Sequence, residues 1–151
     1  MQRAIYFDMD GTIANFYGVD NWLQYLIEEN TFPYQQAKPL FNMQALARVL
    51  HRLQKQGYYI GIVSWLSKNG TDDFNSAVTA TKKAWLKKHL SSVTFDEIKI
   101  IPYGINKATV VKYPHGILFD DEEQNRKLWQ GIAYTQENII NILKTKGIDE
   151  A

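Results

Sequence analysis

At 151 residues, the chain has the length of one domain that can bury a substantial core, and 45% of its residues are hydrophobic, as in ordinary globular proteins. Lysine and arginine number 17 against 16 acidic residues, so the net charge of +1 gives no broad field for gripping nucleic acid or an anionic membrane. The absence of cysteine excludes disulfides and thiolate metal sites.

No targeting segment or membrane span is predicted. The apolar run at residues 4–7 is interrupted by Asp8 and is too short for a signal-peptide core. No later apolar stretch is long enough to span a bilayer. We therefore expect a cytoplasmic protein that makes no contact with membranes.

Residues 4–7 predict a buried strand, and the segment after it, Asp8-Met9-Asp10-Gly11-Thr12, is the most informative in the chain. Side chains alternate along an extended chain, so Asp8 and Asp10 point the same way. Gly11 allows the chain to turn sharply after them. A buried strand that ends in two carboxylates indicates a site for chemistry at the edge of a sheet.

The rest of the chain alternates between predicted helices and strands. Hydrophobic spacing predicts helices over residues 19–27, in a short stretch before Pro39, and over 42–55, 74–90 and 135–146, with a short helix or turn over 107–113. Apolar runs predict strands over residues 58–63, 98–101, 116–119 and 132–134.

Three details of these helices can be tested. The helix at 19–27 is expected to be amphipathic and to begin at Asp20 or Asn21, and the last helix is expected to be capped by Thr135. The buried side of the helix at 74–90 is expected to consist of Val78, Ala84, Trp85 and Leu86.

The alternation of strands and helices predicts an α/β fold, a Rossmann-like parallel sheet with helices on both faces. We expect a single domain over residues 1–151. The helical segment at about 18–40 follows the Asp8 loop directly and interrupts the pattern, so we expect it to form a small cap over the site.

Polar side chains follow three of the predicted strands. Asp8 and Asp10 follow the first, Ser64 follows the strand at 58–63, and Asp120 and Asp121 follow the strand at 116–119. The carboxyl ends of parallel strands meet at one edge of the sheet, so these side chains are expected to converge. Crowded carboxylates repel one another, and a hard divalent cation with oxygen ligands relieves the repulsion. The residues therefore predict a Mg²⁺ site.

With these motifs in this order, the chain resembles the haloacid dehalogenase superfamily of phosphatases and phosphotransferases. The first motif of that family, Asp-x-Asp-Gly-Thr, is matched by residues 8–12, and the second, a serine or threonine after an apolar strand, by Ser64. The fourth is an acidic pair that ends another strand, matched by Asp120 and Asp121. The resemblance covers nearly the whole chain. The chain is also similar to small members encoded in phage and bacterial genomes, a likeness that implies no substrate.

The resemblance implies a phosphomonoester hydrolase that works through an aspartyl phosphate. Asp8 would be the nucleophile, and Asp10 would act as the acid and then as the base. Mg²⁺ would be held by Asp8, the main-chain carbonyl of Asp10 and Asp120, with Asp121 in the coordination shell or just outside it. An alternative for Asp121 stays open, because it could cap a helix that starts at Glu122. Candidate substrate-binding residues are Gly11, Thr12, Ser64 and Trp65.

The third motif of the family is a lysine, and two lysines fit it. Lys107 follows the strand at 98–101 and begins the segment that leads to the strand before Asp120. Lys82 is the alternative, because the helix around it resembles the lysine helix of the 5′(3′)-deoxyribonucleotidases. We rank Lys107 first and Lys82 second as the catalytic residue that neutralises the phosphoryl group.

A small phosphorylated molecule is the expected substrate, with a nucleoside monophosphate as the first to test. Two alternatives remain: a phosphatase that acts on nucleic acid ends, which the near-neutral charge disfavours, and a binding or regulatory module without turnover, which the presence of both Asp8 and Asp10 disfavours. Aromatic residues of the segment at 18–40 could stack on a nucleobase or pack that segment onto the body. They are Trp22, Tyr25, Phe32 and Tyr34.

Overall fold

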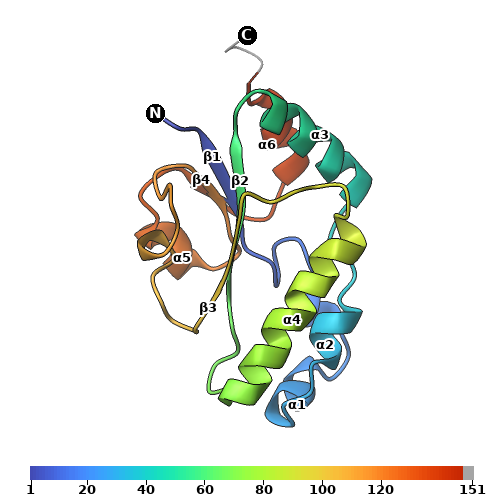
Figure 1. Cartoon of the computed structure of the whole chain (residues 1–151). Coiled ribbons are helices and arrows are strands. Elements are labelled where there is room, and N and C mark those ends of the chain that lie inside the picture. Colours follow the sequence, from blue (N-terminus) through green and yellow to red (C-terminus); the bar gives the residue numbers. More distant parts are fainter. Residues whose placement is uncertain (148–151) are drawn as a thin grey trace.

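The sheet of the computed structural model, which describes residues 1–147, has five parallel strands in the order β3-β2-β1-β4-β5 (Figure 1). The strands are β1 (Ala4–Phe7), β2 (Tyr59–Trp65), β3 (Glu97–Ile101), β4 (Ile117–Phe119) and β5 (Ala133–Tyr134). The predicted α/β fold with a Rossmann-like parallel sheet is therefore confirmed. Residues 148–151, part of the single domain expected over 1–151, lie outside the described residues.

Helices fill the connections between the strands. They are η1 (Phe16–Gly18), α1 (Trp22–Ile27), α2 (Phe32–Gln36), α3 (Met43–Lys55), α4 (Asp72–His89), η2 (Lys107–Thr109), α5 (Glu123–Leu128) and α6 (Ile139–Thr145). Local chemistry explains where α3 begins and ends: the Asn42 side chain accepts a hydrogen bond from the Ala45 N–H, and Gly57 adopts a φ of +90° just after the helix. No helix within residues 1–147 is both long and apolar enough to cross a membrane.

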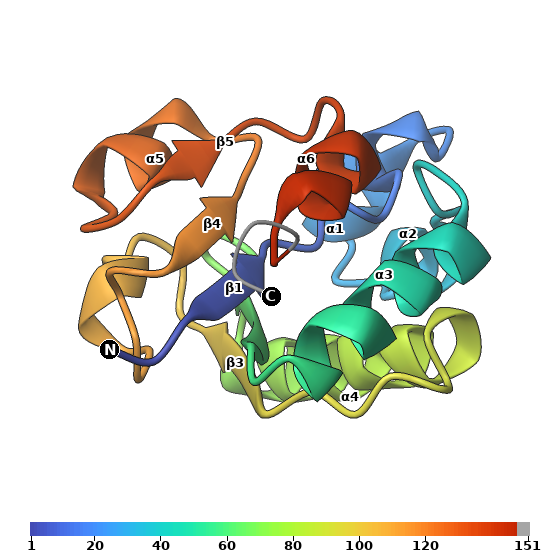
Figure 2. The same cartoon turned by 90° about the horizontal axis from the view of Figure 1, so that it is seen from above.

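The two faces of the sheet are covered unequally. Helices α3, α4 and α6 pack on one face, where Leu50, Trp85 and Leu143 belong to the same buried cluster as Ile5. The other face is covered by η2 and α5 with their flanking loops (Figure 2), and its smaller cluster includes Tyr6. Alternate residues of β1 thus enter opposite clusters, because side chains of a strand alternate between faces. This arrangement confirms helices on both faces.

The helical segment between β1 and α3 lies beside α4. Figure 1 shows α1 and α2 along the first half of α4, and a small buried cluster joins Phe16, Tyr34, Phe74 and Val78. The segment therefore stands next to the edge of the sheet where the strands end.

The structure tests the three sequence expectations about helices. Helix α1 (Trp22–Ile27) has Asn21 at its N-cap position, one of the two expected starts, but it contains no fully buried residue. On α4, Val78, Trp85 and Leu86 are buried as expected, but Ala84 is exposed. Lys82 is buried instead, since residues 74, 78, 82 and 85 follow one helical stripe. Helix α6 begins after Asn138, whose left-handed φ of 62° redirects the chain, and is not capped by Thr135.

Candidate active site

Three carboxylates meet at the carboxyl edge of the sheet. Asp8 follows β1, and Asp120 and Asp121 follow β4; oxygens of all three lie within 4.8 Å of one another. Strand pairing brings them together, because Phe7 is in register with Phe119 and the Asp8 N–H donates to the Phe119 carbonyl at 2.9 Å. The convergence expected from the sequence is therefore present for these aspartates.

The turn after Asp8 is built to fit against Asp121. Gly11 has a φ of +80°, and a Cβ at this position would collide with the Asp121 carboxylate. The Thr12 hydroxyl accepts a hydrogen bond from the Asp121 N–H at 3.1 Å and lies 3.0 Å from Asp8 Oδ2. Gly11 and Thr12, expected to bind substrate, thus hold the aspartates in place.

Lys107 bridges two of the aspartates from the other side. Its Nζ donates to Asp8 Oδ1 at 3.0 Å and to Asp120 Oδ2 at 2.7 Å, and the side chain is 2% exposed. Burial alone would lower the pKa of Lys107, but the two carboxylates outweigh it and raise the pKa. In turn, burial would raise the pKa of Asp8, but the Lys107 ammonium helps to lower it. Both groups are therefore charged.

Burial and the crowding of carboxylates raise the pKa values of Asp120 and Asp121. Burial, reinforced by the negative charge of Asp8, raises the pKa of Asp120 to about 7 and that of Asp121 to about 8. A hard divalent cation prefers clustered carboxylate oxygens and removes the repulsion between them. The donor set thus fits the Mg²⁺ expected from the sequence, and the acidic cluster could hold it.

Asp121 is not the cap of the following helix. The N-cap position of α5 is Glu122, and the Asp121 carboxylate lies 3.1 Å from the Thr12 hydroxyl instead. The capping alternative is therefore wrong, and Asp121 belongs to the acidic cluster.

A second buried lysine, Lys82, contacts Asp10, the other aspartate of the motif. Lys82 Nζ lies 2.9 Å from Asp10 Oδ2 and donates to Ser64 Oγ at 2.8 Å and to the Trp65 carbonyl at 2.6 Å. Burial raises the pKa of Asp10, although Lys82 opposes this effect. The sequence offers Lys107 and Lys82 as alternatives for one role. The structure places both beside the motif, Lys107 against Asp8 and Lys82 against Asp10.

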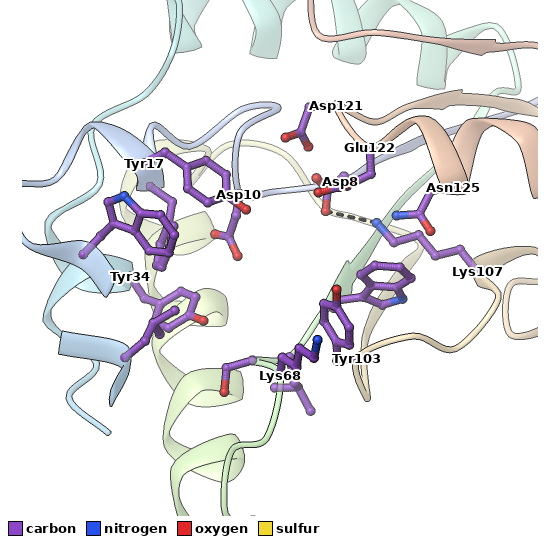
Figure 3. A pocket seen from close by; sticks show the side chains of 16 residues that line it. Asp8, Asp10, Tyr17, Tyr34, Lys68, Tyr103, Lys107, Asp121, Glu122 and Asn125 are labelled. Carbon is purple, nitrogen blue, oxygen red and sulfur yellow. Dashed lines mark hydrogen bonds and ion pairs between the residues drawn. The ribbon is translucent and has the colours of Figure 1, made fainter. Parts of the chain in front are cut away.

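A cavity of about 180 Å³ opens over Asp8 and Asp10. Figure 3 shows Tyr17 and Tyr34 on one side of it and Tyr103 and Lys107 on the other. Trp65 is part of the wall, as expected, and its indole N–H donates to the Ile105 carbonyl at 2.8 Å. Gly11, Thr12 and Ser64 do not line this cavity.

The aromatic residues of the inserted segment divide between the two roles considered from the sequence. Trp22 and Tyr34 line the cavity, and both also pack against Phe16, with ring centroids 5.5 and 4.6 Å away. Tyr25 and Phe32 contact each other at 4.9 Å and are not part of the cavity wall. Trp22 and Tyr34 therefore have both roles: they line the cavity, and they pack against Phe16.

The structure adds Asn125, a residue of α5 that sequence reasoning missed. It lines the cavity and is 3% exposed, yet its amide nitrogen and oxygen have no hydrogen-bond partner within the described residues. Leaving a buried polar group such as this amide unpaired costs about 1–3 kcal/mol. An asparagine in a short polar helix carries no signal of this kind, so only the fold could reveal it. Tyr17 and Tyr103 were missed for the same reason.

Comparison with solved structures supports the fold expected from the motifs. The chain is similar to D,D-heptose 1,7-bisphosphate phosphatase from Burkholderia thailandensis, with a TM-score of 0.50 and 13% sequence identity; the match covers 83% of this chain and 70% of that one. No protein-family model and no curated protein matches the chain. The similarity shows a shared α/β fold and leaves family, activity and substrate to be inferred from the site.

Proposed function

We propose that the protein is a Mg²⁺-dependent phosphomonoester hydrolase that works through an aspartyl phosphate on Asp8. The observation that carries this proposal is the cluster of Asp8, Asp120 and Asp121 at the carboxyl edge of a haloacid dehalogenase-like sheet, bridged by the buried ammonium of Lys107. Buried like charges repel one another and oppose folding, and a bound cation would offset that repulsion.

In the proposed reaction, the ionised carboxylate of Asp8 attacks phosphorus. Lys107, which already touches Asp8, lies on the cavity wall and offsets negative charge on the phosphoryl oxygens. Asp10 gives a proton to the leaving oxygen and then takes one from the water that cleaves the aspartyl phosphate. The raised pKa of Asp10 favours its protonated form and suits the first of these roles.

Asp8, Asp120 and Asp121 are the residues that would hold Mg²⁺, together with the main-chain carbonyl of Asp10. When bound, the ion would neutralise the carboxylates and the phosphoryl group. Thr12 would keep Asp8 and Asp121 in position, since its hydroxyl contacts both carboxylates.

The inserted segment at about 18–40 would act as a small cap. Its residues Trp22, Leu26 and Tyr34 form one wall of the cavity, and Trp65 and Tyr103 form another. A cavity of about 180 Å³ would enclose the phosphoryl end of a small ester between them. The aromatic walls make a nucleoside monophosphate the first physiological substrate to test, since aromatic rings stack on nucleobases.

Hydrolysis of 4-nitrophenyl phosphate tests the proposal. We expect turnover with Mg²⁺ and none in excess chelator, because uncompensated carboxylates repel an anionic ester. Mg²⁺ without substrate should also raise the melting temperature, as a ligand of the folded state does. Full activity in chelator would refute the proposal.

A panel of phosphate esters then separates the alternatives. Preference for nucleoside monophosphates over phosphorylated DNA ends supports the small-molecule activity, and the reverse preference supports end processing. A protein that binds Mg²⁺ and inorganic phosphate but hydrolyses no ester would be a binding module.

A further inference from the structure

Two buried lysines stand at the site, and their hydrogen-bond donors are used differently. A lysine ammonium has three N–H donors. Lys107 has two acceptors, Asp8 Oδ1 and Asp120 Oδ2, and lies on the cavity wall. One of its donors is therefore left for a phosphoryl oxygen.

The Lys82 ammonium is held by three oxygens. It donates to Ser64 Oγ at 2.8 Å and to the Trp65 carbonyl at 2.6 Å, and it forms an ion pair with Asp10 Oδ2 at 2.9 Å. The side chain is 1% exposed and is not part of the cavity wall. With three oxygen partners and no place on the cavity wall, Lys82 is set to hold its partners rather than to contact a substrate.

We propose that Lys82 is a positioning residue, which holds the Asp10 carboxylate and the Ser64 hydroxyl in their working orientations without touching the substrate. The inference rests on the proposed phosphatase function. Lys82 connects three elements, because α4 carries the lysine, β2 carries Ser64 and Trp65, and Asp10 follows β1.

The consequences for the two partners follow from donor and acceptor counts. Lys82 occupies Asp10 Oδ2, which leaves Oδ1 to carry the proton that passes to the leaving oxygen. As the bond from Asp8 to phosphorus forms, the bond from phosphorus to that oxygen breaks and the oxygen takes the proton. The Ser64 oxygen accepts from Lys82, which fixes the orientation of the hydroxyl and leaves its own O–H as a donor.

A positioning role through Asp10 predicts a dependence on the leaving group. 4-Nitrophenolate leaves without help from an acid, whereas phenolate needs a proton, and the two aryl phosphates differ little in size. We expect Lys82→Met to lower kcat/KM about 100-fold for phenyl phosphate and less than about 10-fold for 4-nitrophenyl phosphate, the scale of a displaced general acid. Lys107→Met should lower kcat/KM for both esters by the same factor, since it acts on the phosphoryl group.

Binding of inorganic phosphate in the presence of Mg²⁺, measured by calorimetry, gives a readout that needs no turnover. Lys82→Met should bind phosphate within about threefold of the unmodified protein, and Lys107→Met at least about 10-fold more weakly. Lys83→Met is the matched control, because Lys83 is the exposed neighbour on the same helix, and it should change neither measurement. Lys82→Gln, which keeps one polar donor group, replaces the methionine variant if circular dichroism shows that the latter is unfolded.

Equal losses on both esters together with weakened phosphate binding in the Lys82 variants would overturn the inference and place Lys82 on the substrate. If the unmodified protein hydrolyses neither ester, the phosphatase proposal fails. In that case the phosphate measurement alone still decides whether Lys82 contacts the anion.

Discussion

Within one residue along the paired strands β1 and β4, the molecule changes from a tightly packed apolar contact to a cluster of buried carboxylates. Phe7 and Phe119 are in register, fully buried, and stack with ring centroids 5.4 Å apart. The next residues, Asp8 and Asp120, are buried carboxylates that share Lys107 and repel each other. The same backbone pairing thus produces a stabilising contact and a destabilising one in succession.

Stability and chemistry depend on different regions of the molecule, the apolar core and the acidic edge of the sheet. The apolar core under α3 and α6 holds the strand ends at a spacing that the carboxylates by themselves would oppose. Substitutions in the core should therefore change the free energy of unfolding and leave the activity of the folded protein alone. Substitutions at the acidic edge should change the activity and leave the free energy of unfolding nearly unchanged. Four variants test that division.

Asp8→Asn should lower kcat about 10⁴-fold or more, because the amide keeps the shape of the side chain but is a poor nucleophile. Its melting temperature without Mg²⁺ should change little or fall, since the charged Asp8 carboxylate is paired with Lys107 and its pKa is lowered in the folded protein. Steady-state kinetics and thermal denaturation measure the two effects. Near-normal turnover would move the nucleophile to another residue.

Leu50→Ala should reduce the free energy of unfolding by about 2–5 kcal/mol, because Leu50 is fully buried between α3 and the sheet and its truncation leaves a cavity. Its kcat, measured at a temperature where the variant is folded, should stay within about twofold of the unmodified value. Urea denaturation gives the first quantity. A large fall in kcat would show that core and edge are coupled, against the division proposed here.

Lys107→Ala should lower kcat about 100-fold, the scale of losing one electrostatic stabiliser of the transition state. The corresponding change at the exposed Lys83 should have no effect. Initial rates on 4-nitrophenyl phosphate are sufficient for this comparison. If Lys107→Ala keeps normal kcat, charge on the phosphoryl group is neutralised elsewhere in the site.

Asn125→Leu is expected to stabilise the protein by about 1–3 kcal/mol, because it replaces two buried unpaired polar atoms by apolar ones of similar shape. It should also lower kcat/KM, since a costly unpaired amide beside the cavity implies a partner in the loaded site. Chemical denaturation and kinetics together test this exchange of stability for activity. A variant that is less stable than the unmodified protein would mean that the amide has a structural role.

Much of the fold and part of the site could be predicted from the sequence. The apolar runs and helical spacings predicted all five strands of the parallel sheet, and the motif at residues 8–12 with Asp120 and Asp121 predicted where the acidic cluster would form. These features are local, because the period of hydrophobic residues and the chemistry at a strand end are written in neighbouring residues. Parallel pairing then brings strand ends together without further information.

Only the tertiary structure decided how the long side chains and the cavity walls are used. Lys82 occupies a helical position where spacing alone predicts either a solvated or a buried side chain, and its burial depends on Asp10, Ser64 and the Trp65 carbonyl, which come from other elements. The unpaired amide of Asn125 is likewise visible only after folding, because its nitrogen and oxygen have no hydrogen-bond partner within the described residues. Both results depend on distances between residues far apart in sequence, and those distances are set by packing, which no local pattern encodes.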